Sequence, residues 1–343
     1  MRIGTRNTED AVFLIAEIGN NHEGDHILAK ELIAHAADAG ADAVKFQAIV
    51  PERLVSKQDK QRILQLQKFQ FTPEEFHELR EEAERLKVEF LVTPFDLRAI
   101  EWLSPLVPAW KIASGDNDFT PLLERVAETA KPVIISMGLG RHLEAPIIAR
   151  LFDQIWNRTG TARPDLAMLH CVASYPTPDD QAALAGIRCL DLPGVTPGYS
   201  DHTLGIKAAE LAVAAGARII EKHFTIANDH SDFRDHRLSA NPADFCKLVE
   251  AVRHAERLLG QAPSGPRPCE TVNLELARRS LAAAADLPAG SLLSIEKLAW
   301  IRPGSGIRPG EENLVLGKPI PRSLQTGELI PREFIEIPAT TPS

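Results

Sequence analysis

The sequence predicts an α/β protein, a (β/α)₈ TIM barrel followed by a smaller, mostly β unit. From residue 11 to about 260, short β-branched apolar runs alternate with longer segments of helical period, a pattern typical of a parallel sheet. Eight such pairs in roughly 250 residues fit a closed barrel. No Gly-x-Gly-x-x-Gly turn opens the first helix, which disfavours an open, doubly wound sheet.

The barrel elements follow one another in strict alternation. The first predicted strand reads VFLIAEI, and the last reads RIIEKHF. In chain order, the strands are predicted at 12–18, 41–47, 88–94, 109–114, 132–138, 166–172, 195–200 and 218–224. The helices that connect them are predicted at 26–39, 73–87, 96–103, 119–130, 142–157, 178–189, 205–215 and 241–260.

Several helix ends have their own sequence signals. Thr72-Pro73-Glu74-Glu75 predicts a helix start, with Thr72 as the cap, Pro73 at the first position and Glu75 three residues after the cap. Gly40 and Gly216 close helices just before the next strand. The similar stretches that begin there, Gly40-Ala41-Asp42-Ala43 and Gly216-Ala217-Arg218-Ile219, predict equivalent helix-to-strand joints.

The pattern changes after residue 260. Pro263, Gly265, Pro266 and Pro268 indicate a stiff, solvated connector and a domain boundary. We therefore predict a barrel domain at 1–262, a linker at 263–275 and a C-terminal domain at 276–343. The last domain alternates short apolar stretches with turns, has room for one or two short helices, and is small enough to need a docking partner.

Composition limits the function classes. The chain has 343 residues, of which 44% are hydrophobic and 25% charged, as in ordinary globular proteins. Its net charge of −9 argues against a nucleic acid or an anionic membrane as partner, but not against a small anionic substrate. The four cysteines show no paired spacing, and neither a signal peptide nor a membrane-length apolar run is apparent. We expect a cytoplasmic protein.

Nearly every predicted strand ends in a polar residue. Barrel enzymes carry their chemistry at the carboxyl ends of the strands. Each such residue alone also fits a satisfied core or rim position, but burying many polar groups without ligands costs about 1–3 kcal/mol per unsatisfied group. The strand-end residues are Glu17, Lys45, Gln47, Thr93, Lys111, Ser114, Ser136, Tyr175, Ser200, His202, Glu221, Lys222 and His223.

Two kinds of site follow from these residue types. Lys45 and Lys111, together with strand-end hydroxyls, form a cradle for a phosphorylated, carboxylated anion, although rim salt bridges would also explain the lysines. His202 and His223 facing one cavity would hold a borderline divalent metal, although a core position explains a lone histidine. With two protein nitrogens, such a metal keeps positions open for substrate and water.

Motifs along nearly the whole chain resemble the sialic acid synthase family, the enzymes that make nonulosonic acids. The tail resembles the antifreeze-like (SAF) domain that ends these synthases. The motifs are AEIGNNHEG (16–24), AVKFQ (43–47), TPFD (93–96), KIASGD (111–116), LHCVASYPTP (169–178), GYSDHTLG (198–205), EKHFT (221–225) and IRPGSGI (301–307).

The resemblance implies condensation of phosphoenolpyruvate with an open-chain N-acylated aldose, either N-acetylmannosamine or a diacetamido-trideoxyhexose. Water attacks C2 and phosphate leaves, and Asp116 stands where the family has the carboxylate proposed to handle that water. A divalent ion on His202 and His223, manganese with magnesium or cobalt as alternatives, polarises the aldehyde. By the same resemblance, phosphoenolpyruvate is held by Lys45, Thr93, Lys111, Ser114, Ser136 and Ser200, and the sugar by Glu17, Gln47, Tyr175 and Asp235.

The tail has a role in this resemblance. Arg302 matches the family arginine that reaches into the barrel of a partner subunit, which implies a domain-swapped homodimer whose tail completes the sugar site. A surface turn residue is the alternative for Arg302.

Three departures leave the aldose open. Asp116 replaces a usual glutamate, Ala173 replaces an asparagine found in some members, and Phe233-Arg234-Asp235-His236 replaces Gly-Pro-Asp-His. Two other functions use parts of the same pattern. A Schiff-base pyruvate aldolase would act through Lys45, Lys111 or Lys222. A catalytically retired, sugar-binding barrel would fit the changes at Asp116 and Ala173.

Overall fold

The computed structural model describes residues 1–261 and 264–336, and the chain divides into two compact units, Met1–Gly260 and Gln261–Ser343. The predicted linker contains a short 3₁₀ turn, η6 (Pro268–Glu270), and a helix, α10 (Thr271–Ala277), where the sequence predicted no regular structure before residue 276. Pro263 and the final segment 337–343 lie outside the described residues.

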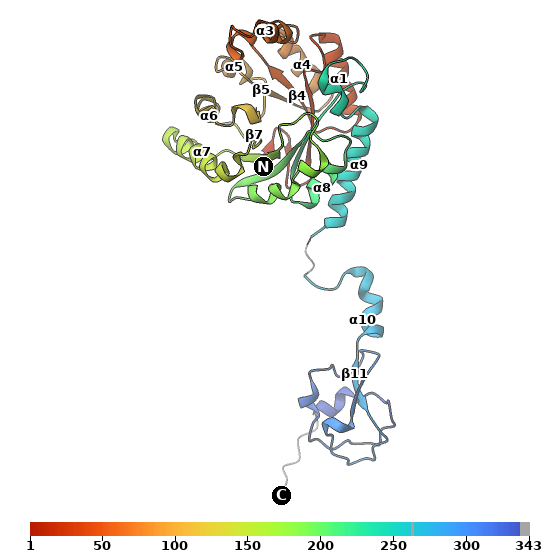
Figure 1. The fold of residues 1–343 in the computed structure, drawn as a ribbon. Coiled ribbons are helices and arrows are strands. Elements are labelled where there is room, and N and C mark those ends of the chain that lie inside the picture. The colour runs from red at the N-terminus through yellow and green to blue at the C-terminus, as the bar shows by residue number, and fades with distance from the viewer. Residues whose placement is uncertain (262–263, 337–343) are drawn as a thin grey trace. The chain divides into compact units, whose positions relative to one another are not determined.

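The first unit is the predicted closed barrel of eight parallel strands. Around the barrel the strands run in the order β10-β3-β4-β5-β6-β7-β8-β9, and the helices surround them (Figure 1). The fold prediction is confirmed. The strands are β3 (Phe13–Gly19), β4 (Ala43–Ala48), β5 (Glu89–Pro94), β6 (Trp110–Ile112), β7 (Val133–Ser136), β8 (Leu166–Cys171), β9 (Val195–Asp201) and β10 (Ile219–His223).

Most predicted helices are present, and their ends behave as the sequence indicated. Thr72 Oγ1 accepts from the Glu75 amide at 3.2 Å, and Glu75 Oε2 accepts from the Thr72 amide at 2.7 Å. Gly40 and Gly216 both have left-handed backbone conformations, with φ of 90° and 111°. The predicted helices found are α1 (His26–Asp38), α4 (Pro73–Arg85), α5 (Ala99–Leu103), α6 (Thr120–Ala127), α7 (Ala145–Thr159), α8 (Lys207–Ala214) and α9 (Pro242–Leu259).

The prediction of an α-helix at 178–189 is wrong. The segment forms two 3₁₀ pieces, η3 (Asp179–Gln181) and η4 (Leu184–Leu190), separated by Ala183 with φ of 47°. A left-handed residue ends any regular right-handed helix, so the segment cannot continue as one. Other 3₁₀ turns in this unit are η1 (Ser114–Asp116), η2 (Arg141–Glu144) and η5 (Arg234–Leu238).

Two structures in the first unit were not predicted. Helices α2 (Pro51–Leu54) and α3 (Lys60–Gln67) occupy the loop between β4 and α4. A short antiparallel pair, β1 (Arg2–Ile3) and β2 (Arg6–Asn7), precedes the barrel. Met1 and Ile3 pack with inward-facing apolar residues such as Phe13, so the chain's first residues close the amino end of the barrel.

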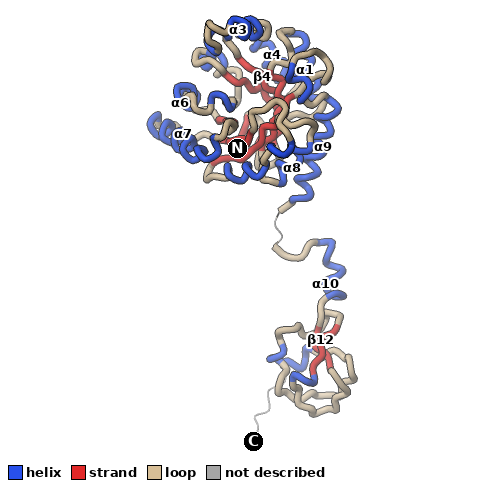
Figure 2. Tube along the Cα trace, in the orientation of Figure 1, coloured by secondary structure: helices blue, strands red, loops and turns tan. Residues whose placement is uncertain are grey.

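The second unit has its own small core. Strands β11 (Ser280–Ala283) and β12 (Leu298–Ile301) pair antiparallel, and Ser280 lies opposite Ile301. Loops and short 3₁₀ turns make up most of the rest (Figure 2); the turns are η7 (Ile295–Lys297), η8 (Glu312–Leu314) and η9 (Arg332–Glu336). Leu281, Leu287 and Ile330 belong to its apolar core. Across both units, none of the described helices is long and apolar enough to span a bilayer.

Candidate active site

The strand sequences place apolar and polar residues on the same inner face of the barrel. In β3, Phe13 and Ile15 point inward near the amino end, and Glu17 follows on the same face because side chains alternate along a strand. In β4, Ala43 precedes Lys45 in the same way. The inner face of the barrel is therefore apolar toward the amino ends of the strands and polar at their carboxyl ends, where the active sites of barrel enzymes are found.

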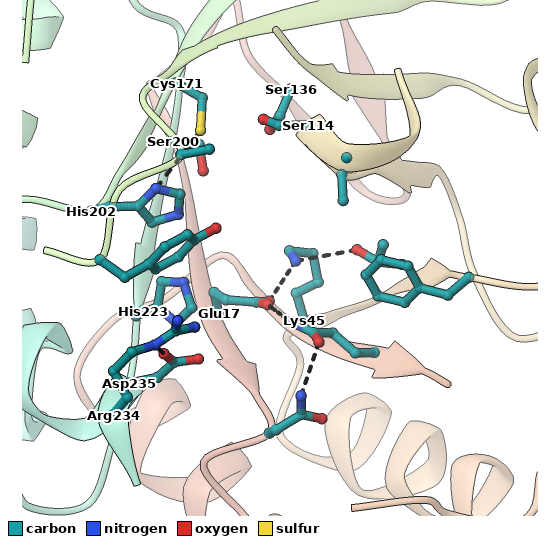
Figure 3. Close-up of a pocket in the computed structure, with 18 of the residues that line it drawn as sticks. Glu17, Lys45, Ser114, Ser136, Cys171, Ser200, His202, His223, Arg234 and Asp235 are labelled. Carbon is teal, nitrogen blue, oxygen red and sulfur yellow. Dashed lines mark hydrogen bonds and ion pairs between the residues drawn. The ribbon is translucent and has the colours of Figure 1, made fainter. Parts of the chain in front are cut away.

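These polar ends surround a cavity of about 570 Å³. The cavity brings together residues that are far apart in the chain, and Figure 3 labels ten of them around a common space. Of the predicted site residues in the first unit, Asp116 is the one that does not line it. The predicted residues that do are Glu17, Lys45, Gln47, Thr93, Lys111, Ser114, Ser136, Tyr175, Ser200, His202, His223 and Asp235.

Two buried lysines share two buried glutamates at the bottom of the cavity. Lys45 Nζ lies 2.6 Å from Glu17 Oε2 and 3.7 Å from Glu221 Oε2, and it donates to Thr93 Oγ1 at 3.3 Å. Lys111 Nζ lies 3.6 Å from Glu221 Oε1 and donates to Ser136 Oγ at 2.8 Å. Glu221 therefore links both lysines.

Burial and ion pairing set the pKa values of this cluster. Burial disfavours the carboxylate of Glu221, but Lys111 and Lys45 outweigh that effect and hold its pKa at about 2. Burial raises the pKa of Glu17. Burial also lowers the pKa of Lys111, whereas at Lys45 the carboxylates of Glu17 and Glu221 outweigh burial and raise the pKa of the amine. Lys45 is thus the firmly charged cation.

Further hydroxyl groups line the cavity beside the charged cluster. Ser200 Oγ donates to Glu221 Oε1 at 2.8 Å, and Ser114 Oγ accepts from the Gly138 amide at 3.1 Å. A Cβ at position 138 would stand 2.5 Å from Ser114 Oγ, so this approach requires glycine. The lysines and hydroxyl groups predicted to hold an anion therefore line one cavity, and their binding of an anion stays a prediction.

The two predicted metal ligands, His202 and His223, lie near each other in the cavity wall and come from the ends of neighbouring strands. His202 directly follows β9 and His223 ends β10, and their ring centroids are 5.3 Å apart. His202 Nδ1 donates to the Val172 carbonyl at 2.8 Å, so Nε2 is the ring nitrogen that remains to bind a metal. Burial lowers the pKa of His223 to about 4, so its ring is neutral at physiological pH.

Both imidazoles fit the chemistry of metal ligation. His223 Nδ1 is buried and lacks a hydrogen-bond partner among the described residues, as expected of an atom that awaits a ligand. Over 1–261 and 264–336, no group of three or more His, Cys, Asp or Glu side chains could hold a metal ion. Any metal here would therefore rely on the two histidines, with its other positions open.

The outer part of the cavity carries hydrogen-bonding groups in pairs. Gln47 Nε2 donates to Glu17 Oε1 at 2.8 Å. Arg234 Nε pairs with Asp235 Oδ1 at 3.0 Å, and its guanidinium lies 4.8 Å from the centre of the Tyr175 ring. The Tyr175 ring in turn contacts His202 at a centroid distance of 4.2 Å. The amide of Gln47, the hydroxyl of Tyr175 and the Arg234–Asp235 pair offer hydrogen-bond donors and acceptors, which suit a ligand with many hydroxyl groups.

Asp116, Arg302 and Lys222 were also singled out from the sequence, and none of them is among the residues that line the cavity. Asp116 ends η1, next to the cavity-lining Gly115, and its buried Oδ2 has no partner in the described structure. Burial and Asp118 raise the pKa of Asp116 to about 6. Arg302 is exposed in the second unit, directly after β12, and its proposed reach into a partner's barrel stays a prediction. Lys222 is buried outside the cavity, 3.0 Å from Asp201 Oδ2.

Sequence reasoning left several lining residues out of the site. Glu221 was noted as a strand-end residue but given no role, although its spacing of two from His223 places both side chains on one face. Cys171 lies inward at the end of β8, 3.8 Å from His202 Nδ1. Segments between the strands contribute lining residues that no strand pattern could have indicated, namely Arg62, Gln65 and Leu66 on α3, Arg234 at the start of η5, and Asn20, Phe69, Phe95, Leu139, Asp232 and Phe233 in loops.

Comparison with known families gives two matches that cover most of the chain. A profile of the NeuB family matches residues 32–264. A profile of the SAF domain matches residues 278–336. The two matched segments correspond to the barrel and to the second unit.

Individual proteins match over almost the full length. The chain is 38% identical to an uncharacterized protein of Methanocaldococcus jannaschii over 96% of this chain and 97% of that protein. It is 36% identical to N,N'-diacetyllegionaminic acid synthase of Legionella pneumophila over 97% of each chain. A crystal structure of N-acetylneuraminic acid synthetase from Leptospira borgpetersenii, in complex with citrate, superposes with a TM-score of 0.74 at 34% identity, covering 80% of this chain and 95% of that one.

Proposed function

The chain belongs to the NeuB family, and from that premise we propose that it condenses phosphoenolpyruvate with an N-acylated aldose to give a nonulosonic acid and phosphate. The observation that carries the proposal is the joint presence, in one cavity, of two lysines with neighbouring hydroxyl groups and of a pair of imidazoles. The lysines and hydroxyl groups suit an anion that has both a phosphate and a carboxylate, and the imidazoles suit a metal.

Phosphoenolpyruvate would bind at the bottom of the cavity. Lys45 and Lys111 supply positive charge, and Thr93, Ser136 and Ser200 already donate to or accept from the charged groups there. Ser114 adds a further hydroxyl to the cavity lining. The two glutamates keep the lysines paired until an anionic ligand arrives, which avoids leaving uncompensated buried charge.

The aldose would bind toward the mouth, where Gln47, Tyr175 and Asp235 line the cavity and Glu17 supports Gln47. A divalent ion held by His202 and His223, which we propose to be manganese, with magnesium or cobalt as alternatives, would act as a Lewis acid on the sugar aldehyde. The neutral ring of His223 and the remaining ring nitrogen of His202 are available for that ion.

The proposed reaction forms one carbon–carbon bond and breaks one carbon–oxygen bond. C3 of phosphoenolpyruvate attacks the aldehyde carbon, and the aldehyde oxygen becomes a hydroxyl with a proton that comes from water. The oxygen of that water adds to C2, the bond from C2 to the phosphate oxygen breaks, and the remaining hydroxyl proton leaves with phosphate as the ketone forms. Asp116, with its pKa of about 6, is suited to take a proton from water near neutral pH.

A Schiff-base aldolase is less well supported. Lys222 does not line the cavity and pairs with Asp201. Lys45 has a raised pKa, which disfavours the free amine that a nucleophile needs. Burial lowers the pKa of Lys111, so borohydride reduction in the presence of pyruvate is the discriminating experiment.

The proposal is tested with purified protein, phosphoenolpyruvate, manganese and a panel of N-acylated aldoses. Phosphate release that depends on the sugar, with a product mass equal to the sum of both substrates and water minus phosphoric acid, is expected. Covalent trapping by borohydride and pyruvate, without phosphate release from phosphoenolpyruvate, would support the aldolase instead.

A further inference from the structure

We propose that Glu23 and His236 form a clamp that positions Asp235, the carboxylate proposed to contact the sugar. Glu23 lies in the loop between β3 and α1, and His236 lies in η5, directly after Asp235. Neither Glu23 nor His236 is among the residues that line the cavity, so both act through Asp235 and are positioning residues. The inference rests on the proposed function, because it concerns how that site holds its sugar.

The His236 ring is held at both of its nitrogen atoms. Nε2 lies 3.0 Å from Glu23 Oε1, and Nδ1 lies 2.6 Å from Thr225 Oγ1. An ionised carboxylate can only accept, so Nε2 is the donor of the first bond. The residue is 0% exposed, so water cannot replace either partner if the ring turns. His236 is therefore a fixed point in the chain, one residue from Asp235.

One oxygen atom of Glu23 holds two parts of the segment that follows β10. Glu23 Oε1 accepts from His236 Nε2 and also from Ser231 Oγ, the latter at 2.6 Å. The same Ser231 Oγ accepts from the Phe233 amide at 3.0 Å. Burial disfavours the Glu23 carboxylate, but the hydrogen bonds from Ser231 and His236 outweigh burial and lower its pKa. Glu23 thus stays ionised at neutral pH, and its two partners lie on either side of Asp235 in the chain.

The backbone around Asp235 is held from the same side. Ser239 Oγ donates to the Asp235 carbonyl at 2.6 Å and accepts from Asn21 Nδ2 at 2.9 Å. Asn228 Nδ2 donates to the His236 carbonyl at 2.9 Å. Strands β3 and β10 are neighbours in the barrel, so the loops that follow them meet at its carboxyl end. The segment that carries Asp235 is therefore tied to the loop after β3 through side chains and backbone alike.

The place of Asp235 matters because its carboxylate faces the reacting groups. Asp235 is 8% exposed and lines the cavity. Burial lowers the pKa of His223, and the Asp235 carboxylate opposes that effect, so the two side chains lie close enough to interact. Figure 3 shows both on the same side of the cavity. A shift of about 1 Å in a group that orients a substrate can cost about 100-fold in rate.

The first test compares Glu23→Ala with Glu23→Gln, using the N-acylated aldose that gives the fastest phosphate release. Glu23→Ala loses both hydrogen bonds, so kcat/KM for the sugar should fall about 10- to 100-fold, while KM for phosphoenolpyruvate changes by less than about twofold. Glu23→Gln keeps an oxygen acceptor and should recover most of that loss. Residue 23 has φ of 49°, a conformation that glutamate, glutamine and alanine tolerate about equally, so backbone strain does not distinguish the variants.

Glu82→Ala is the matched control. The Glu82 side chain is 20% exposed, against 33% for Glu23, and it pairs with Arg85 on the same helix, away from the lining of the cavity. Its loss should leave both kinetic constants unchanged. Equal losses in Glu23→Ala and Glu23→Gln, or an equal rise in KM for both substrates, would overturn the clamp.

A double-mutant cycle tests whether Glu23 acts through Asp235. If it does, adding Glu23→Ala to Asp235→Ala should lower kcat/KM for the sugar by less than about twofold beyond Asp235→Ala alone. Losses that multiply as independent effects would contradict the proposal.

Hydrogen exchange tests the clamp without any reaction. The backbone amides of residues 226–240 should exchange at least about tenfold faster in Glu23→Ala than in the wild type or in Glu23→Gln, while the amides of β4 and β5 stay unchanged. Unchanged exchange in 226–240, or faster exchange throughout the barrel, would overturn the clamp. If no sugar supports phosphate release, the proposed reaction is wrong, and the exchange rates still decide whether Glu23 holds this segment.

Discussion

Replacement of Glu221 by glutamine should strongly destabilise the protein, because one buried carboxylate neutralises two buried lysines. Glu221 lies 3.7 Å from the Lys45 amine and 3.6 Å from the Lys111 amine, and its side chain is 7% exposed. Glutamine keeps the shape and removes the charge. Lys111 would then keep only neutral partners, the Ser136 hydroxyl and the Ile112 carbonyl, among the contacts described.

The magnitude follows from these distances. At an effective dielectric constant of about 20, each attraction is worth about 5 kcal/mol. The desolvation of the carboxylate offsets part of that gain, and breaking a buried ion pair typically costs about 3–5 kcal/mol. For a domain of this size, each kcal/mol lowers Tm by about 2–4 °C, so Glu221→Gln should melt about 6–20 °C below the wild type.

The pH dependence provides a second reading. The folded-state pKa of Glu221, about 2, lies below its ordinary value of 4.5. Its contribution to stability is therefore fully present above about pH 5.5 and is lost as pH falls toward 2. The Tm difference between wild type and Glu221→Gln should be constant near neutral pH and shrink in acid.

Thermal denaturation and urea titration measure the effect, with Glu101→Gln as control. The Glu101 side chain is 75% exposed and pairs with Arg125 at 3.2 Å, so its loss should cost about 0–1 kcal/mol. Phosphoenolpyruvate should raise Tm more in Glu221→Gln than in the wild type, because its charge replaces the missing carboxylate. A Tm for Glu221→Gln within about 2 °C of the wild type would refute the reasoning.

Two further predictions concern the proposed catalytic groups. Burial raises the pKa of Asp116 from 3.8 to about 6, so the contribution of this carboxyl group to stability falls as pH rises through that range. Asp116→Asn should therefore be more stable than the wild type at pH 7.5, by at most about 3 kcal/mol, and as stable as the wild type near pH 4. The turnover of Asp116→Asn should fall. Denaturant titrations at both pH values and phosphate release check this, and equal stability at pH 7.5 would contradict it. His202→Ala should lose manganese binding in equilibrium dialysis and lower sugar-dependent phosphate release at least about 100-fold, and undiminished manganese binding would argue against the two-histidine site.

The barrel was predictable because most of its strands begin with short apolar runs and because helical periods separate them. The segment between β4 and α4 was not, since α2 has four residues and α3 has mostly polar residues with one buried side chain, Leu66. The failed helix at 178–189 has apolar residues at helical spacing, but Ala183 adopts a left-handed conformation that no local residue preference indicated. The pair β1 and β2 has two residues in each strand, too few for any periodicity.

The site could be predicted where it lies on strands and less well where it lies on loops. Lys45, Lys111 and His223 could be predicted as site residues because each is a polar residue near the end of a strand, and the barrel geometry brings all strand ends together. Phe69 and Phe233 gave no such signal, because their meeting depends on how two loops fold over the mouth. The special role of Glu221, which links both lysines, required distances that a sequence does not contain.

The most direct test of the central claim is a single incubation with phosphoenolpyruvate, manganese and a 2,4-diacetamido-2,4,6-trideoxyhexose, read for phosphate and for product mass. The account predicts one phosphate released for each molecule of nonulosonic acid formed, and none without the sugar. Phosphate release without a new carbon–carbon bond, or no reaction with any N-acylated aldose, would contradict it.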